Sequence, residues 1–170
     1  WDNPAAKKAF IKAAEIAKNA GKKVALSLSD SFCVSRHRES FIKLLDNYID
    51  ILFANEDEIK SLYETSRIDL AIEKLRNKCK IAAITMGKNG SILISQGKEV
   101  TIEPFIFGEA IDTTGAGDLY AGGFLKGLSN NLNPIISAKM GSICAGHIVT
   151  KLGSRSNIDL LNLINSNLKI

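Results

Sequence analysis

Short apolar segments alternate with amphipathic helical patterns along almost the whole chain. The patterns predict buried strands at residues 24–28, 48–54 and 81–85, and a hairpin of residues 91–94 and 99–102 that turns at Gln96-Gly97. Helices are predicted at residues 4–20, 36–46, 55–63, 67–78, 116–128, 134–151 and 157–168. This alternation predicts an α/β fold with three layers (αβα), in which helices cover both faces of a mostly parallel sheet.

The turn Asp112-Thr-Thr-Gly-Ala-Gly-Asp118 is the most informative local signal. A strand-like apolar approach precedes it, and a helix pattern follows with apolar positions Leu119, Phe124, Leu125 and Leu128. Gly115 and Gly117 let the backbone approach a ligand closely. The first N–H groups of a helix lack partners inside it, and the dipole makes that end positive. The turn therefore suits a bound phosphate.

Asp118 places a carboxylate beside this anion site, where it would repel a bound anion. A base that takes a proton from an attacking hydroxyl, while the N–H groups hold a phosphoryl group, explains both features. A structural alternative remains open, in which the glycines serve packing and Asp118 caps the helix. A dinucleotide fingerprint does not fit because Tyr120 occupies the position of its third glycine, and no P-loop pattern occurs in the chain.

Several polar motifs follow predicted strands directly. They contain Asp30, Asn55, Thr85 to Gly87, and Asp112 to Asp118. In open α/β sheets, ligands bind beyond the carboxyl ends of the strands. The sequence therefore predicts one ligand site at that edge of the sheet.

Bulk properties exclude several classes of protein. A chain of 170 residues favours one domain, and its net charge of +4 comes from basic residues interspersed with acidic ones, which does not indicate nucleic-acid binding. Neither a membrane span nor a signal peptide is recognisable. Cys33, Cys79 and Cys144 are far apart, which favours reduced thiols and a cytoplasmic location. Nothing in the sequence indicates the oligomeric state.

Four motifs together resemble the ribokinase-like (PfkB) carbohydrate kinase superfamily. Asp112 to Asp118 resembles its signature, Thr85 to Ser91 its T-x-G-x-x-G nucleotide loop, and Asp50 to Ile59 the strand that leads into N-x-x-E. Ser27 to Arg38 is most similar to the bacterial adenosine-kinase-like branch. The motifs occur in the family's order, and nothing matches the family's N-terminal lid region. Residues 1–170 are thus expected to be the nucleotide-binding and catalytic part of a domain that is incomplete at its N-terminus.

The resemblance implies roles for particular residues. Asp118 would be the catalytic base, and the backbone of Gly115, Ala116 and Gly117 would form the anion hole. Asn55 and Glu58 would order Mg²⁺ through water, although a helix cap explains the same pair. The remaining nucleotide contacts would come from Thr85, Gly87, Gly90, Thr114, Ala145 and His147.

Two of these assignments keep an alternative. The small-residue helix around Ala145 and His147 would leave room for adenine, or it would simply form a packing face. Backbone oxygens of Asp112 and Thr114 would contact K⁺, but residues 153–157 depart from the family's pattern beside that cation, so K⁺ binding is left open.

The resemblance implies an ATP-dependent phosphotransferase with Mg²⁺ as cofactor. It would move the γ-phosphoryl group to a primary hydroxyl of a nucleoside, with adenosine preferred, or of another ribose-like or fructose-type sugar. A non-catalytic nucleotide-binding fragment is the alternative. We expect residues 1–170 alone to have little activity, because most acceptor contacts of the family lie in the region that nothing here matches.

Overall fold

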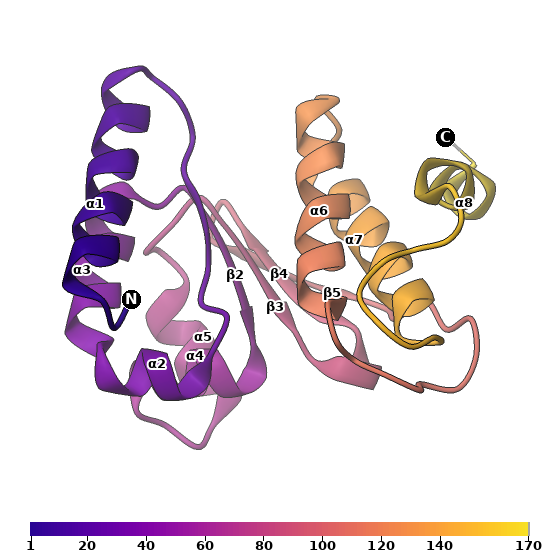
Figure 1. Ribbon diagram of the computed structural model, residues 1–170, viewed down its shortest axis with the longest axis horizontal. Coiled ribbons are helices and arrows are strands. Elements are labelled where there is room, and N and C mark those ends of the chain that lie inside the picture. Colours follow the sequence, from indigo (N-terminus) through magenta and orange to yellow (C-terminus); the bar gives the residue numbers. More distant parts are fainter. Residues whose placement is uncertain (170) are drawn as a thin grey trace. The chain divides into compact units, whose positions relative to one another are not determined.

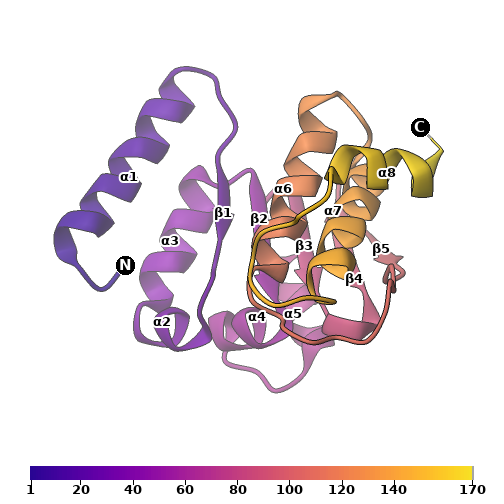
Figure 2. The same cartoon turned by 45° about the vertical axis from the view of Figure 1, so that its right-hand side comes forward.

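The computed structural model describes residues 1–169, which form two compact units (Figures 1 and 2). Unit 1 comprises Trp1–Ile84 and Ile94–Lys98, and unit 2 comprises Thr85–Leu93 and the chain from Glu99 onward. No helix within residues 1–169 combines the length and the apolar character that crossing a membrane requires.

Unit 1 contains most of the predicted strands and helices of the N-terminal half. Its elements are α1 (Pro4–Asn19), β1 (Ala25–Ser27), α2 (Ser31–Arg36), α3 (Arg38–Tyr48), β2 (Ile51–Asn55), α4 (Glu56–Tyr63), α5 (Ile68–Leu75) and β3 (Ile81–Thr85). Asn3 caps α1 by accepting the N–H of Ala5 at 2.8 Å, and Pro4 occupies the first turn. Buried residues such as Leu52, Ile59 and Leu75 form its core.

Unit 2 begins at Thr85, the last residue of β3. Its elements are the 3₁₀ turn η1 (Gly87–Asn89), most of the hairpin β4 (Ser91–Ser95) and β5 (Lys98–Ile102), and the helices α6 (Ala116–Ser129), α7 (Pro134–Ile148) and α8 (Leu160–Leu168). The hairpin turns at Gln96-Gly97, as predicted. Asn133 caps α7 by accepting the N–H of Ile136 at 2.9 Å.

The five strands form one sheet in the order β1-β2-β3-β4-β5. β1 and β2 pair in parallel, with Leu26 opposite Leu52. Short connections on both sides of β4 reverse the chain, so β4 alone runs against the other four strands. The sheet is therefore mixed and mostly parallel, and the predicted α/β class is confirmed.

Helices α6 and α7 pack closely because small residues face each other. A Cβ built on Gly123 would lie 2.8 Å from the carbonyl oxygen of Met140, and one on Gly141 would lie 2.6 Å from that of Tyr120. The predicted apolar face of α6 is partly wrong, because Leu125 is 38% exposed. Its buried positions are Tyr120, Gly123, Phe124 and Gly127.

One further prediction needs correction, and one helix was missed. Residues 103–113 form neither strand nor helix, so no strand leads directly into the turn at Asp112. The N–H groups of Ile111 and Asp112 donate instead to the carbonyl oxygen of Val149, just after α7. Helix α2 was not predicted; Asp30 caps it by accepting the N–H of Cys33 at 2.7 Å, and Val34 is fully buried.

Candidate active site

The first turn of α6 presents backbone N–H groups that the fold leaves unused. The N–H groups of Gly115, Gly117 and Asp118 have no hydrogen-bond acceptor within residues 1–169. The N–H of Ala116 donates to the carbonyl oxygen of Thr113 at 3.1 Å. Together with the positive end of the helix dipole, the unused groups can receive an anion.

Gly115 is required at this turn by both its backbone and its surroundings. Its φ is +78°, in the left-handed region, and a Cβ there would lie 2.5 Å from Cβ of Ser154. A Cβ on Gly117 would meet nothing within 4 Å. The two glycines thus differ: Gly115 is needed for the fold, whereas Gly117 borders open space.

Asp118 lies in the first turn of α6 with an exposed side chain. Its carboxylate makes no hydrogen bond or ion pair with any other described residue. It is therefore free to accept a proton from a molecule bound beside the helix.

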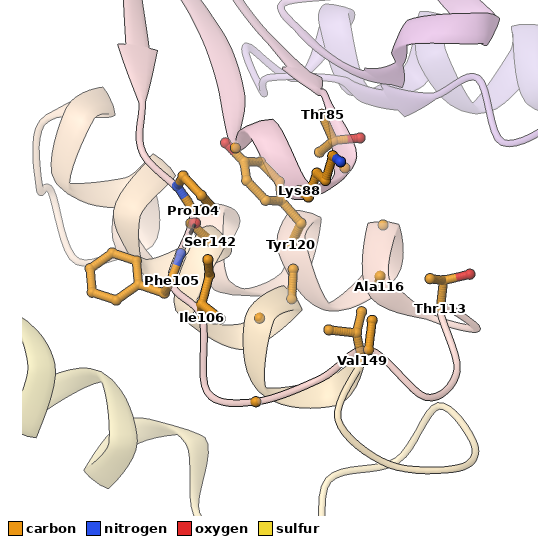
Figure 3. A pocket seen from close by; sticks show the side chains of 17 residues that line it. Thr85, Lys88, Pro104, Phe105, Ile106, Thr113, Ala116, Tyr120, Ser142 and Val149 are labelled. Atoms are coloured by element: carbon orange, nitrogen blue, oxygen red, sulfur yellow. Dashed lines mark hydrogen bonds between the residues drawn. The ribbon is translucent and has the colours of Figure 1, made fainter.

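A cavity of about 370 Å³ opens within unit 2 (Figure 3). Ligand pockets typically begin near this size, at about 300 Å³. The predicted site residues that line it are Thr85, Gly87, Gly90, Ala116, Gly117 and Ala145. Its other walls come from Lys88, Pro104, Phe105, Ile106, Gly108, Ala110, Thr113, Tyr120, Ser142, Gly146 and Val149. One space thus joins the nucleotide-loop motif, the small-residue helix and the first turn of α6.

The apolar wall at Phe105 and Ile106 depends on close contact between this segment and α7. The hydroxyl of Ser142 donates to the carbonyl oxygen of Glu103 at 3.2 Å and accepts the N–H of Phe105 at 3.3 Å. A Cβ on Gly146 would lie only 1.9 Å from the carbonyl oxygen of Phe105. The small residues of α7 therefore admit a neighbouring segment, which in turn shapes the cavity.

Tyr120 forms another wall and is 3% exposed. Its hydroxyl lies 2.8 Å from Oγ of Ser91. Burial raises the pKa of Tyr120 to about 12, so the phenol stays neutral. The ring contributes a fixed, uncharged surface to the cavity.

His147 is on α7 but does not line the cavity. Its Nε2 lies 3.2 Å from Oγ of Ser156, and its ring meets the edge of Phe107. Burial and then the charge of Lys151 lower its pKa. Of the two residues predicted for an adenine pocket, the structure places only Ala145 on the cavity wall.

Asp112 connects two loops near α6. Its Oδ1 accepts the N–H of Thr114 at 2.9 Å, and its Oδ2 accepts the N–H of Gly153 at 2.9 Å. Hydrogen bonds, first from the Thr114 side chain and then from Gly153, lower the pKa of the carboxyl group. The backbone oxygens of Asp112 and Thr114 accept no hydrogen bond within residues 1–169, so their chemistry fits a monovalent cation.

Asn55 and Glu58 lie in unit 1, where they form a capping box at the start of α4. Oδ1 of Asn55 accepts the N–H of Glu58 at 2.8 Å, while the two carboxylate oxygens accept the backbone and side-chain N–H groups of Asn55 at 2.9 and 2.8 Å. Glu58 is 5% exposed, and burial raises its pKa. Residues 1–169 hold no cluster of three or more metal-binding side chains.

Sequence analysis missed much of the cavity wall. Pro104, Phe105 and Ile106 belong to no predicted motif, although they are an apolar run outside any strand or helix. Ile106 is 75% exposed and lines the cavity, so its apolar side chain is available to a bound molecule. Tyr120 entered the sequence analysis only because it occupies the position of the third glycine in a dinucleotide fingerprint, and its place in the cavity wall was not predicted.

The mixed sheet and the turn at α6 define a ribokinase-like α/β fold. A probable sugar kinase from Rhizobium etli has the same fold, with a TM-score of 0.95 and 37% identity over 100% of this chain and 52% of its own. An adenosine kinase from Sinorhizobium meliloti gives a TM-score of 0.94 and 39% identity over 98% of this chain and 51% of its own.

The sequence comparison agrees with the fold. Residues 2–160 match the pfkB family of carbohydrate kinases, and the chain belongs to that family. A ribokinase from Staphylococcus aureus is 31% identical over 164 residues, which are 92% of this chain and 51% of that protein. The predicted family is therefore confirmed. The chain spans about half the length of these relatives.

Proposed function

We propose that this chain is the nucleotide-binding and catalytic part of an ATP-dependent phosphotransferase. The cavity of unit 2 carries the proposal, because it joins apolar walls suited to a base with the first turn of α6, where Gly117 lines the cavity and its N–H is unused. Its reaction would move the γ-phosphoryl group of ATP to a primary hydroxyl of a nucleoside or sugar. A cytoplasmic location suits its three free thiols.

Asp118 is the proposed base. Its carboxylate takes the proton of the acceptor hydroxyl as the oxygen attacks phosphorus. The backbone at Gly115, Ala116 and Gly117 stabilises charge on the transferring group, with Gly115 and Gly117 offering N–H groups that no other residue uses. Positioning and electrostatics of this kind provide most of the catalysis in phosphoryl transfer.

Mg²⁺ offsets the charge of the triphosphate when it is bound. Its preference for oxygen ligands and retained water fits Glu58, whose carboxylate already accepts hydrogen bonds from Asn55. Both residues would therefore act through water rather than as direct ligands. Asp112 and Thr114 would hold K⁺ through their backbone oxygens. Faster turnover of the full-length protein in a K⁺ salt than in the salt of a bulky organic cation would support this site.

Adenosine is the proposed acceptor. The motif from Ser27 to Arg38 and the similarity to the Sinorhizobium meliloti adenosine kinase support it. Arg36 pairs with Asp2 at 2.8 Å, and Arg38 pairs with Glu64 at 2.9 Å. An arginine that binds the phosphate of a sugar phosphate would be expected to lack such a partner, so these pairs favour a nucleoside. Another ribose-like or fructose-type sugar is the next candidate, and a non-catalytic nucleotide-binding fragment is the alternative from another class.

The decisive experiment compares Asp118→Asn with the wild type in the full-length protein. Loss of a general base should lower turnover by about 10²–10⁴-fold, while ATP affinity is retained. Asp69→Asn is the matched control, because Asp69 is exposed and its carboxylate pairs with the exposed Arg67. Near-normal turnover of the Asp118 variant would remove the base assignment.

The acceptor is tested with a panel of adenosine, ribose, fructose and fructose phosphate at equal concentrations. Ratios of kcat/KM decide specificity, and adenosine should lead. If a sugar phosphate leads, the nucleoside assignment falls while the kinase assignment stands. The purified 170-residue chain alone should show little or no transfer, with at most weak ATP binding; robust turnover would contradict this expectation.

A further inference from the structure

Lys88 is the only cationic side chain among the described residues that line the cavity of unit 2. It is exposed and lies in η1, directly after β3. No carboxylate within residues 1–169 pairs with it, which is also true of other exposed lysines such as Lys22 and Lys126. Lys88 differs from them because it borders the cavity. The cation at the cavity wall is thus left without a counter-charge.

The backbone that carries Lys88 is held in place. The N–H of Met86 donates to the carbonyl oxygen of Gly90 at 2.8 Å and closes the turn. Gly90 has a φ of +81°, and a Cβ there would lie 2.1 Å from the carbonyl oxygen of Ile102 at the end of β5. The turn is therefore packed against the hairpin, and the flexible part of Lys88 is its side chain alone.

The rest of the cavity indicates what this charge would meet. No carboxylate lines the described walls, and Phe105, Ile106 and Val149 provide an apolar surface. Ala116 and Gly117, from the positive end of α6, belong to the same walls, and Figure 3 shows Lys88 and Ala116 entering from different elements. Lys88 and the positive end of α6 give this part of the cavity a positive electrostatic potential. An uncharged nucleoside does not require such a potential, whereas a chain of phosphates does.

We propose that Lys88 binds the phosphate chain of the donor nucleotide. This assignment rests on the proposed function, since it takes the cavity as the donor site. Lys88 acts as a point charge on a long stem, so it can follow the phosphates while the base stays against the apolar wall. The ammonium complements the first turn of α6, which contributes fixed N–H groups and no cationic side chain.

The test uses full-length protein and displacement of a fluorescent ATP analogue, which reports on the donor site alone. Lys88→Met should weaken ATP binding about tenfold, equivalent to about 1.4 kcal/mol. Adenine, as a competitor with neither phosphates nor the acceptor hydroxyl, should bind the donor site of this variant within about twofold of wild type. Lys88→Arg should recover most of the ATP affinity, and wild-type affinity should fall more steeply with salt than that of Lys88→Met.

Lys126→Met is the matched control, because Lys126 is in the last turn of α6 and does not line the cavity. If Lys88→Met binds ATP as tightly as Lys126→Met does, the proposal is wrong. Equal weakening of ATP and adenine binding also overturns it, because Lys88 would then shape the pocket rather than bind phosphate. Asp118→Asn separates the two hypotheses: its effect on turnover tests the kinase assignment whatever Lys88 does.

Discussion

The carboxylate of Asp112 accepts the backbone N–H of Gly153 at 2.9 Å, which ties the turn before α6 to the loop after α7. Its other oxygen accepts the N–H of Thr114 within the turn itself. The loop also covers Gly115, because Ser154 leaves no room for a side chain there. One exposed carboxylate thus fixes both segments that shape the start of α6.

Replacement of this carboxylate should reduce activity more than stability. Asp112→Ala removes both acceptors, and we expect kcat/KM of the full-length protein to fall by about tenfold, which corresponds to about 1.4 kcal/mol. Asp112→Asn keeps one oxygen acceptor, so its kcat/KM should lie between those of the wild type and Asp112→Ala. Thermal unfolding of the same variants serves as the control. Wild-type kinetics for Asp112→Ala would show that the two loops are positioned without this link.

The two glycines of the turn should respond differently to alanine. Gly115→Ala places a side chain at φ +78° and against Ser154, so it should lower the free energy of unfolding by at least about 1 kcal/mol, together with activity. Gly117→Ala has space for its methyl group and should not lower the melting temperature. The methyl group would still enter the cavity, so ATP binding should weaken. A destabilised Gly117→Ala, or one with normal ATP affinity, would contradict this distinction.

Local signals were sufficient for much of the fold. The bounds of β3 match the prediction because a short apolar run follows Lys80 and ends at Thr85, two positions before Gly87. Asn3-Pro4 marked the start of α1 for a similar local reason. Residues 110–111 were misjudged, because the backbone N–H of Ile111 donates to Val149 after α7 instead of a strand, and the Ile111 side chain is 63% exposed.

The candidate site was only partly visible in the sequence. Gly117 and Gly90 could be predicted from glycine motifs, because each residue belongs to a turn whose sequence pattern spans only a few positions. The wall at Phe105 and Ile106 arises from contact with Gly146, about forty positions along the chain, and no local pattern reports such a contact. His147 looked equivalent to Ala145, but its helical position directs it to Ser156 instead.

Glu58 should make stability depend on pH. Burial raises its pKa in the folded state, so between the unfolded and folded pKa values the folded protein binds more protons than the unfolded chain. The contribution of Glu58 to the free energy of unfolding is therefore largest at low pH and declines as pH rises through that window. Urea unfolding from pH 4 to 7 should show a flatter curve for Glu58→Gln than for wild type. Glu73→Gln, at an exposed position in α5, should not flatten it, and equal slopes for wild type and Glu58→Gln would oppose this account.

Gly146 tests whether the apolar wall of the cavity depends on the close contact with α7. Gly146→Ala would place Cβ 1.9 Å from the carbonyl oxygen of Phe105, so the wall segment must move away. Overpacking of this kind typically lowers stability by about 1–3 kcal/mol, and the displaced wall should also weaken ATP binding.

Gly122→Ala is the matched control for Gly146→Ala. Gly122 lies inside α6, and a Cβ there meets nothing within 4 Å. Alanine should therefore stabilise the helix by about 0.5–1 kcal/mol and leave ATP affinity unchanged. Denaturant unfolding and nucleotide titration of both variants check the pair. If Gly146→Ala binds ATP normally while its stability falls, the contact with α7 holds the fold together but does not set the shape of the cavity.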